Sequence, residues 1–147
     1  MQSTTWSPAL RRVTVLAMLL AAGLISVGLI SSTSASAGVA TCDGVRATIV
    51  GTDGNNEIDG TAGRDVVQAR GGNDEVDTLG GNDLICGGAG SDNLSGDAGD
   101  DRVLGNAGND ELDGNAGVDR LVGGLGFDTI DGGLGNDSCS GEEVERC

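Results

Sequence analysis

The chain carries an acidic side chain at a fixed spacing of nine residues, a pattern that suits repeated binding of a hard cation. From Gly51 to Ser140 a nine-residue block is repeated ten times without a change of register. Position six of the block is aspartate in nine copies and asparagine in the first. These position-six residues are Asn56, Asp65, Asp74, Asp83, Asp92, Asp101, Asp110, Asp119, Asp128 and Asp137.

Glycine occupies position four of every block, two residues before the position-six side chain. Glycine takes positive φ without steric cost, which a tight turn repeated every nine residues requires. It also leaves the turn carbonyls unobstructed, so they can act as ligands beside the aspartates. The position-four glycines are Gly54, Gly63, Gly72, Gly81, Gly90, Gly99, Gly108, Gly117, Gly126 and Gly135.

The turns must be held by strands, and position eight supplies the pattern for them. It is apolar in every block and flanked by variable residues, as in a strand with one inward side chain. Two turns and two strands make a coil of eighteen residues, so ten blocks predict five coils. We therefore predict an all-β fold, a parallel β-roll (a right-handed β-solenoid) of about five 18-residue coils. The position-eight residues are Ile58, Val67, Val76, Ile85, Leu94, Val103, Leu112, Leu121, Ile130 and Cys139.

The stacking of coils predicts where cations bind. Turns of alternate blocks lie on the same side of the roll, one coil or roughly 4.8 Å apart. An ion between two such turns can take an aspartate from each and complete its shell with turn carbonyls, the oxygen ligands that calcium prefers. Five turns on each side leave four gaps, so the geometry predicts up to about eight Ca²⁺ ions.

Three blocks, GGAGSDNLS, GGLGFDTID and GGLGNDSCS, resemble the RTX, or haemolysin-type, calcium-binding nonapeptide GGxGxDxUx. The other seven blocks are degenerate copies in the same register. This resemblance implies that the position-six side chains and the carbonyls around the position-four glycines are calcium ligands. Arg70 and Leu79 stand where the motif has its second glycine, which weakens the prediction for the neighbouring sites. Asn56 should weaken the first site because it lacks a charge.

The N-terminus predicts the compartment. Arg11 and Arg12 precede an apolar run from Val13 to Ile30, and Ala35-Ser36-Ala37 matches a cleavage signal. We predict a Sec-type signal peptide over 1–37 and a secreted, extracellular protein, with an uncleaved membrane anchor as the alternative. The remaining chain then divides into an N-terminal cap (38–50), the calcium-binding β-roll (51–140) and a C-terminal cap (141–147).

Composition limits the partners. Residues 38–147 contain six arginines, no lysine or histidine, and 23 acidic residues, a net charge of −17. Nucleic acid and anionic membrane surfaces are excluded as partners, whereas calcium ions are favoured. The identity of any cell-surface or extracellular partner stays open. Without histidine and lysine there is no histidine-dependent triad, HExxH zinc site or P-loop, and we predict no enzymatic activity.

The same composition predicts disorder without calcium, because a thin apolar core must order a glycine-rich and self-repelling chain. The function we expect is therefore that of a secreted calcium-binding protein that folds on binding Ca²⁺. The alternative is a structural or adhesive cell-surface module in which calcium is only a structural ion.

Four cysteines, Cys42, Cys86, Cys139 and Cys147, predict two disulfides with three possible pairings. Cys139 and Cys147 close a short loop, so we pair them, and Cys42 then pairs with Cys86. The second pair spans about two coils, beyond disulfide reach unless the segment up to Val50 folds back along the roll.

Overall fold

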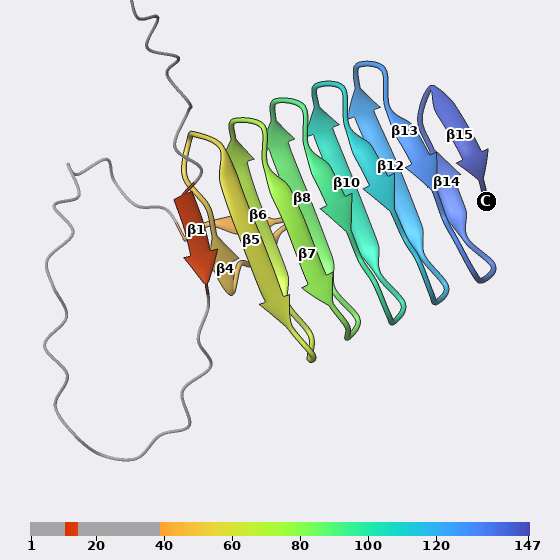
Figure 1. Ribbon diagram of the computed structural model, residues 1–147, viewed down its shortest axis with the longest axis horizontal. Helices are drawn as coiled ribbons and strands as arrows, with labels where there is room; N and C mark the ends of the chain where they lie inside the picture. The colour runs from red at the N-terminus through yellow and green to blue at the C-terminus, as the bar shows by residue number, and fades with distance from the viewer. Residues whose placement is uncertain (1–10, 15–38) are drawn as a thin grey trace, which may run out of the picture.

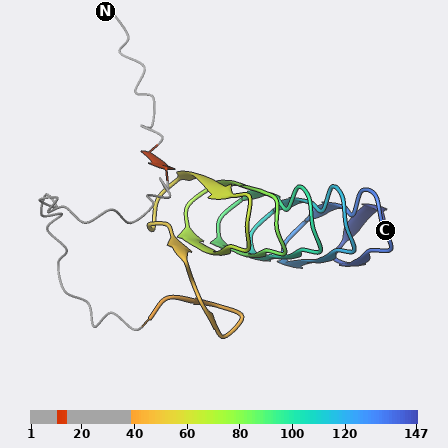
Figure 2. The same ribbon diagram turned by 90° about the horizontal axis from the view of Figure 1, so that it is seen from below.

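A computed structural model describes residues 11–14 and 39–147 of the chain. Two parallel sheets face each other and successive coils stack along the long axis (Figures 1 and 2). Consecutive strands of the roll alternate between the two sheets, and those paired within a sheet are related by eighteen residues, as in the register of Val76 with Leu94. The predicted all-β solenoid of about five coils is confirmed, and the described residues contain no helix.

The first sheet has seven strands, formed by the odd-numbered blocks and the two ends of the described chain. In order, it contains β1 (Arg11–Thr14), β5 (Asn56–Thr61), β7 (Glu75–Leu79), β9 (Asn93–Ser95), β11 (Glu111–Asp113), β13 (Thr129–Asp131) and β15 (Glu143–Arg146).

The second sheet has six strands, formed by the even-numbered blocks and the segment before the first block. In order, it contains β14 (Ser138–Ser140), β12 (Arg120–Leu125), β10 (Arg102–Ala107), β8 (Leu84–Ala89), β6 (Val66–Gly71) and β4 (Ile49–Val50).

The core lies between the sheets and consists of the position-eight side chains, as predicted. The nine aliphatic members, from Ile58 to Ile130, are all no more than 1% exposed. Cys139 in the last block is only partly buried. Ile49 and Ala69 complete the cluster, so the segment before the first block closes one end of the core.

Several strands are longer than the three residues that the nine-residue pattern predicted. β10, for example, continues from its own block into the first three positions of the next, where Asn106 pairs with Gly88 and Gly124. The first three positions of the turn are therefore partly strand, because their backbone groups bond to the coils above and below. The part of the turn that is free of strand pairing is correspondingly shorter.

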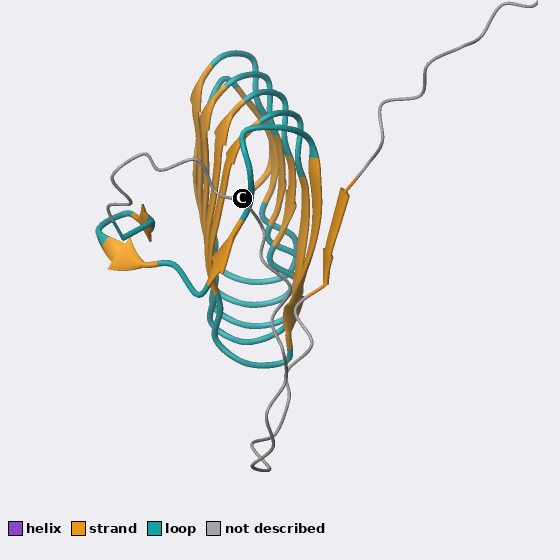
Figure 3. Cartoon of the chain, turned by 90° about the vertical axis from the view of Figure 1, so that its left-hand side faces the viewer, coloured by secondary structure: helices purple, strands orange, loops and turns teal. Residues whose placement is uncertain are grey.

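Within 38–50, which we predicted to be an N-terminal cap, β2 (Thr41–Cys42) and β3 (Val45–Arg46) form a hairpin and a separate antiparallel sheet. Figure 3 shows it outside the two sheets of the roll. Cys42 packs with Val66 and Leu84 in a second apolar cluster on the outer face of the six-stranded sheet. The chain thus folds back along the roll, and Cys42 bonds Cys86 with a Cα–Cα distance of 5.6 Å, the pairing that we predicted.

This hairpin explains two exceptions to the expected alternation. Val66 and Leu84 occupy position seven, which we expected to face solvent, yet they are 2% and 5% exposed. Both contact the cluster around Cys42, because the hairpin covers them. An ion pair of 2.5 Å between Arg102 and Asp43 fastens the hairpin further along the same face.

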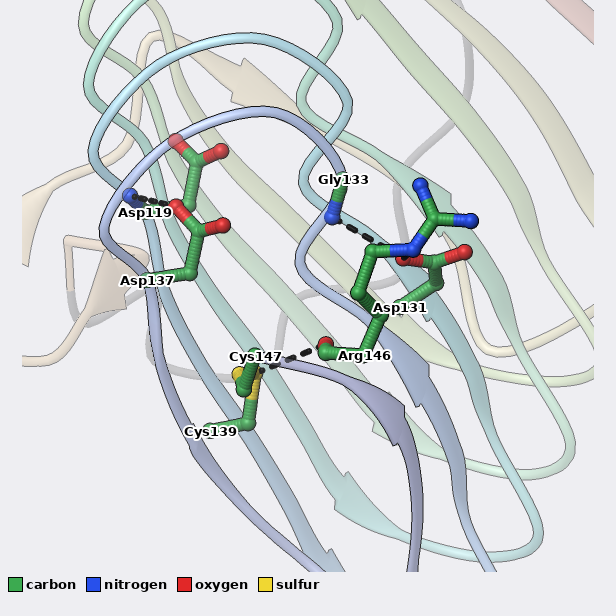
Figure 4. Close-up of a disulfide and its surroundings, with 7 residues drawn as sticks. All are labelled: Asp119, Asp131, Gly133, Asp137, Cys139, Arg146 and Cys147. Carbon is green, nitrogen blue, oxygen red and sulfur yellow. Dashed lines mark hydrogen bonds and ion pairs between the residues drawn. A yellow bond between two sulfur atoms is a disulfide. The ribbon is translucent and has the colours of Figure 1, made fainter.

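Residues 141–147, which we predicted to be a C-terminal cap, follow the last strand of the six-stranded sheet, and Figure 4 shows the disulfide that ties them to it. β15 adds to the seven-stranded sheet beside β13, with an irregularity in register at Ile130 and Asp131. Cys139 bonds Cys147, as predicted, and the Arg146 guanidinium lies 3.7 Å from the Asp131 carboxylate. The charged residues of β15 protect the last edge of that sheet from pairing with another chain.

Most of the predicted signal peptide lies outside the described residues. Its Arg11–Thr14 stretch forms β1, which pairs in parallel with β5 at the first edge of the seven-stranded sheet. Within residues 11–14 and 39–147, no helix has the length and apolar character to cross a membrane.

Candidate metal sites in the stacked turns

The position-six aspartates form a hydrogen-bonded ladder along each side of the roll. In eight of the nine position-six aspartates, Oδ1 accepts the backbone N–H of the position-six residue one coil earlier, at 2.7–3.1 Å. Figure 4 shows one such bond, from the Asp119 amide to the Asp137 carboxylate. The bond fixes the carboxylate within its turn. The aspartates that accept in this way are Asp74, Asp83, Asp92, Asp101, Asp110, Asp119, Asp128 and Asp137.

The second oxygen of these carboxylates has no partner in most of the turns. Seven Oδ2 atoms are buried without a hydrogen bond, and their residues are only 1–3% exposed. A buried carboxylate oxygen without a partner is costly, so a repeated set of them points to a bound cation. The seven residues are Asp74, Asp83, Asp92, Asp101, Asp110, Asp119 and Asp128.

The raised pKa values of the ladder carboxyls also show that burial disfavours their charged form. Burial raises the pKa of Asp92 and of Asp101 to about 6, and neighbouring aspartates in the ladder add to the rise. Burial is also the main cause that raises the pKa of Asp74, Asp83, Asp110 and Asp119. Backbone or side-chain hydrogen bonds oppose this shift without cancelling it. Positive charge placed among these groups would therefore stabilise the ionised ladder.

The position-four glycines leave a cradle between successive turns. In six turns, a Cβ added at this glycine would lie 1.5–2.0 Å from the carbonyl oxygen of the position-four glycine one coil earlier. That carbonyl therefore points into the gap between stacked turns. All six have positive φ, as the sequence predicted. They are Gly90, Gly99, Gly108, Gly117, Gly126 and Gly135.

Position-one glycines leave room beside the second carboxylate oxygen, Oδ2. A Cβ added to Gly87, Gly105 or Gly123 would lie 2.2–2.4 Å from Oδ2 of the aspartate in its own turn. Ala69 and Thr78 replace this glycine in the third and fourth blocks and are fully buried. A side chain there takes room beside the carboxylate, so those two turns are more crowded than the rest.

These groups fit a calcium ion. The oxygens that line the stacked turns belong to carboxylates and backbone carbonyls, which are hard ligands of the kind calcium selects. Among residues 11–14 and 39–147, no group of three or more His, Cys, Asp or Glu side chains is placed to hold a metal. The ions that we predicted between stacked turns rely on main-chain oxygens beside the aspartates.

The first coil differs from the others. Thr61 donates its hydroxyl and its backbone N–H to Oδ2 of Asp65, so this carboxylate oxygen is already paired. The Asn56 carboxamide donates to the Gly54 carbonyl and to Asp74. Gly54 and Gly63 lack the positive φ of the later position-four glycines. Protein groups thus occupy part of the space in which the sequence placed the first ligands.

The backbone conformation at position two was not predicted from the sequence. Position two also has positive φ in eight blocks, including the bulky Arg70 (φ 85°) and Leu79 (φ 66°). The signal was present, since Asp97, Asn106 and Asn115 are of the types that tolerate this conformation.

Position five carries a second ladder, in the direction opposite to the first. Oδ1 of Asn55, Asn73 and Asn109 accepts the backbone N–H of the residue one coil later, at 2.9–3.0 Å. Its sequence signal was the frequency of Asn and Asp immediately before the position-six residue.

A family model describes the same region. The RTX calcium-binding nonapeptide repeat, a model of four copies, matches residues 50–85, 87–121 and 113–143. The matched segments cover more than half of the chain, which therefore belongs to this repeat family. A comparison with curated proteins finds no match.

Proposed function

We propose that this protein is a secreted, non-enzymatic calcium-binding protein whose roll folds when Ca²⁺ binds between the stacked turns. The observation that carries the proposal is the set of seven buried Oδ2 atoms without a partner, repeated at the coil spacing. The repeat family and the oxygen-only lining of the gaps support calcium as the ion. Bound calcium would supply the positive charge that offsets the carboxylates.

We assign the ligands to the position-six aspartates and the position-four carbonyls. The assignment is strongest for the turns from the fifth block onward, where glycine at positions one and four leaves the gap open. It is weakest for Asn56 and Asp65, whose polar atoms already have protein partners. Occupancy should therefore fall below the eight ions that equal turns would allow, with the first coil the last to fill.

Folding on binding follows from the same carboxylates. Burial raises their pKa values, so at neutral pH the metal-free fold confines negative charges that water would solvate better. Calcium binds the stacked state and not the open chain, which shifts the equilibrium toward the roll. Secretion supplies both the millimolar calcium that such sites need and the oxidising conditions for two disulfides.

Equilibrium dialysis against ⁴⁵Ca²⁺, run beside far-ultraviolet circular dichroism, tests the proposal. We expect several ions per chain to bind over the same range of calcium concentration in which β-structure appears. A chain that takes up no more than one ion, or that binds calcium without a change in its spectrum, would remove the coupling of folding to binding.

A further inference from the structure

A groove of about 400 Å³ runs along one side of the roll, where the turns enter the seven-stranded sheet. Position-five residues such as Asn73 and Asn109 and position-seven residues such as Glu75 and Glu111 line it. The position-six aspartates Asp74, Asp92 and Asp110, to which we assign calcium, lie between these two rows in the sequence and also line the groove. From Asn56 to Thr129 the groove crosses five neighbouring strands, a length of roughly 19 Å at the usual strand spacing. The groove is therefore long and narrow, a shape in which an extended ligand chain can lie.

The polar groups of the groove are held in fixed positions. Oδ1 of Asn73 accepts the Ser91 amide, and Oδ1 of Asn109 accepts the Phe127 amide, both at 3.0 Å. This leaves each carboxamide Nδ2 as a hydrogen-bond donor. In the described part of the chain, the carboxylates of Glu75 and Glu111 form no hydrogen bond or ion pair, and both residues are exposed. The groove thus combines fixed donors with acceptors.

This donor and acceptor pair occurs twice. Asn73 with Glu75 and Asn109 with Glu111 are separated by two coils, or roughly 9.6 Å along the axis. Asn93 lies between them in the row of position-seven residues. A ligand that matches the groove should therefore repeat its own polar groups at about twice the strand spacing.

The aromatic side chain at one end of the groove adds an apolar contact. Phe127 is 76% exposed and lies in the lining. An exposed aromatic ring beside carboxylates and amides is suited to a ligand with an apolar face and hydroxyls at its edge. The acidic lining and the charge of the chain disfavour an anionic ligand.

From these features we propose that the groove binds a neutral β-1,4-linked glycan along the axis of the roll. Sugar hydroxyls both donate and accept, so they can satisfy the carboxamides and the carboxylates together. In a β-1,4-linked chain alternate sugars face the same way, which gives the repeat of every second unit that the two polar pairs require. Stacked coils build the groove, so this inference rests on the proposed calcium-dependent fold.

Isothermal titration calorimetry with cellohexaose and chitohexaose tests the proposal, in calcium that saturates the spectral change of the chain. The folded spectrum is checked first, so a failure to bind sugar is distinct from a failure to fold. We expect binding of at least one of these hexasaccharides, and none of maltohexaose, whose α-1,4 linkages curve the chain. A folded protein that binds neither β-linked sugar, or binds maltohexaose as well, overturns the proposal.

Matched variants locate the site. Phe127→Ala should weaken binding by about three- to tenfold, the range for loss of one aromatic contact. Val118→Ala is its control, since Val118 occupies the same turn position on the opposite side of the roll and is 56% exposed. Equal affinities for the two variants would place the sugar outside the groove.

A charge-matched pair completes the test. The double variant Glu75→Ala with Glu111→Ala should abolish measurable binding, whereas Glu142→Ala with Glu145→Ala removes the same charge from the C-terminal cap and should not. Hexalysine is titrated in parallel. If the first double variant lost hexalysine binding and kept glycan binding, the groove would be a site for cationic peptides and the glycan assignment would be wrong.

Discussion

Replacing Gly108 with alanine should weaken calcium-dependent folding, because the backbone of the preceding coil already fills the space that the methyl group would need. The added Cβ would lie 1.7 Å from the Gly90 carbonyl oxygen, and Gly108 has φ of 145°. Relief requires the two coils to separate, which opens the gap in which we place calcium. The same change at Gly63 meets only the Thr61 hydroxyl, at 4.0 Å, and involves no positive φ.

The size of the effect follows from two costs. Positive φ costs alanine about 1–2 kcal/mol, and forcing a methyl group into packed backbone costs about 1–3 kcal/mol, so the total is about 2–5 kcal/mol. Divided over up to about eight ions, this is about 0.25–0.6 kcal/mol for each ion. The calcium concentration at the folding midpoint should then rise by about 1.5- to 3-fold.

Calcium titrations followed by far-ultraviolet circular dichroism measure this shift. Gly63→Ala should retain the wild-type midpoint. Gly135→Ala separates steric conflict from position in the roll, because Gly135 lies in the last block and its Cβ would approach the Gly117 carbonyl oxygen to 1.6 Å. It should shift the midpoint as well. A wild-type midpoint for Gly108→Ala, or the same shift for Gly63→Ala, would refute the reasoning from stacked carbonyls.

Three further predictions concern the ligands, the ion and pH. Asp110→Ala should raise the calcium concentration at the folding midpoint more than Asn56→Ala does. A central aspartate borders two stacked gaps, so its loss interrupts propagation between coils. Equal midpoints for the two variants in parallel titrations would count against stacked sites. Magnesium at about 10 mM, roughly ten times the calcium range of extracellular modules, should leave the chelator-stripped chain disordered, because Mg²⁺ requires shorter bonds and keeps its water. A β-spectrum in magnesium would mean that charge neutralisation alone orders the chain. Metal-free protein should gain β-structure as the pH falls from about 6 to about 4. The pKa values of Asp92 and Asp101 lie at about 6 in the fold against an ordinary 3.8, so between these pH values the folded state holds protons that the unfolded chain releases. A metal-free spectrum that does not change across this range, or loses β-structure on acidification, would contradict the last of these.

The fold could be predicted from the sequence because the nine-residue period holds throughout the roll. A single slip of register would have moved Leu94 or Leu112 out of the core, so an uninterrupted pattern over ten blocks left few alternatives. The disulfide between Cys42 and Cys86 was also accessible, although the path of the hairpin was not. That path depends on Val66 and Leu84, which look like outward positions in the repeat and become a packing surface only when the hairpin lies on them.

The candidate site was accessible in part. The spacing predicted that Asp92 and Asp110 lie in stacked turns. It did not predict that their two carboxylate oxygens differ, with Oδ1 accepting a backbone amide and Oδ2 left without a partner. Nor did it reveal that Thr61 pairs with the Asp65 carboxylate, because a threonine at position two is unremarkable in a degenerate block. Such differences between turns arise from individual side-chain contacts, which a nine-residue consensus does not describe.

The most direct test of the central claim is the position of the calcium ions themselves. Anomalous scattering from crystals of the calcium-loaded protein should show ions between turns one coil apart, beside Oδ2 of Asp92 and Asp110 and within reach of the Gly90 carbonyl. Ions found only at exposed carboxylates such as Glu75 and Glu111, with the position-six aspartates uncoordinated, would contradict the account.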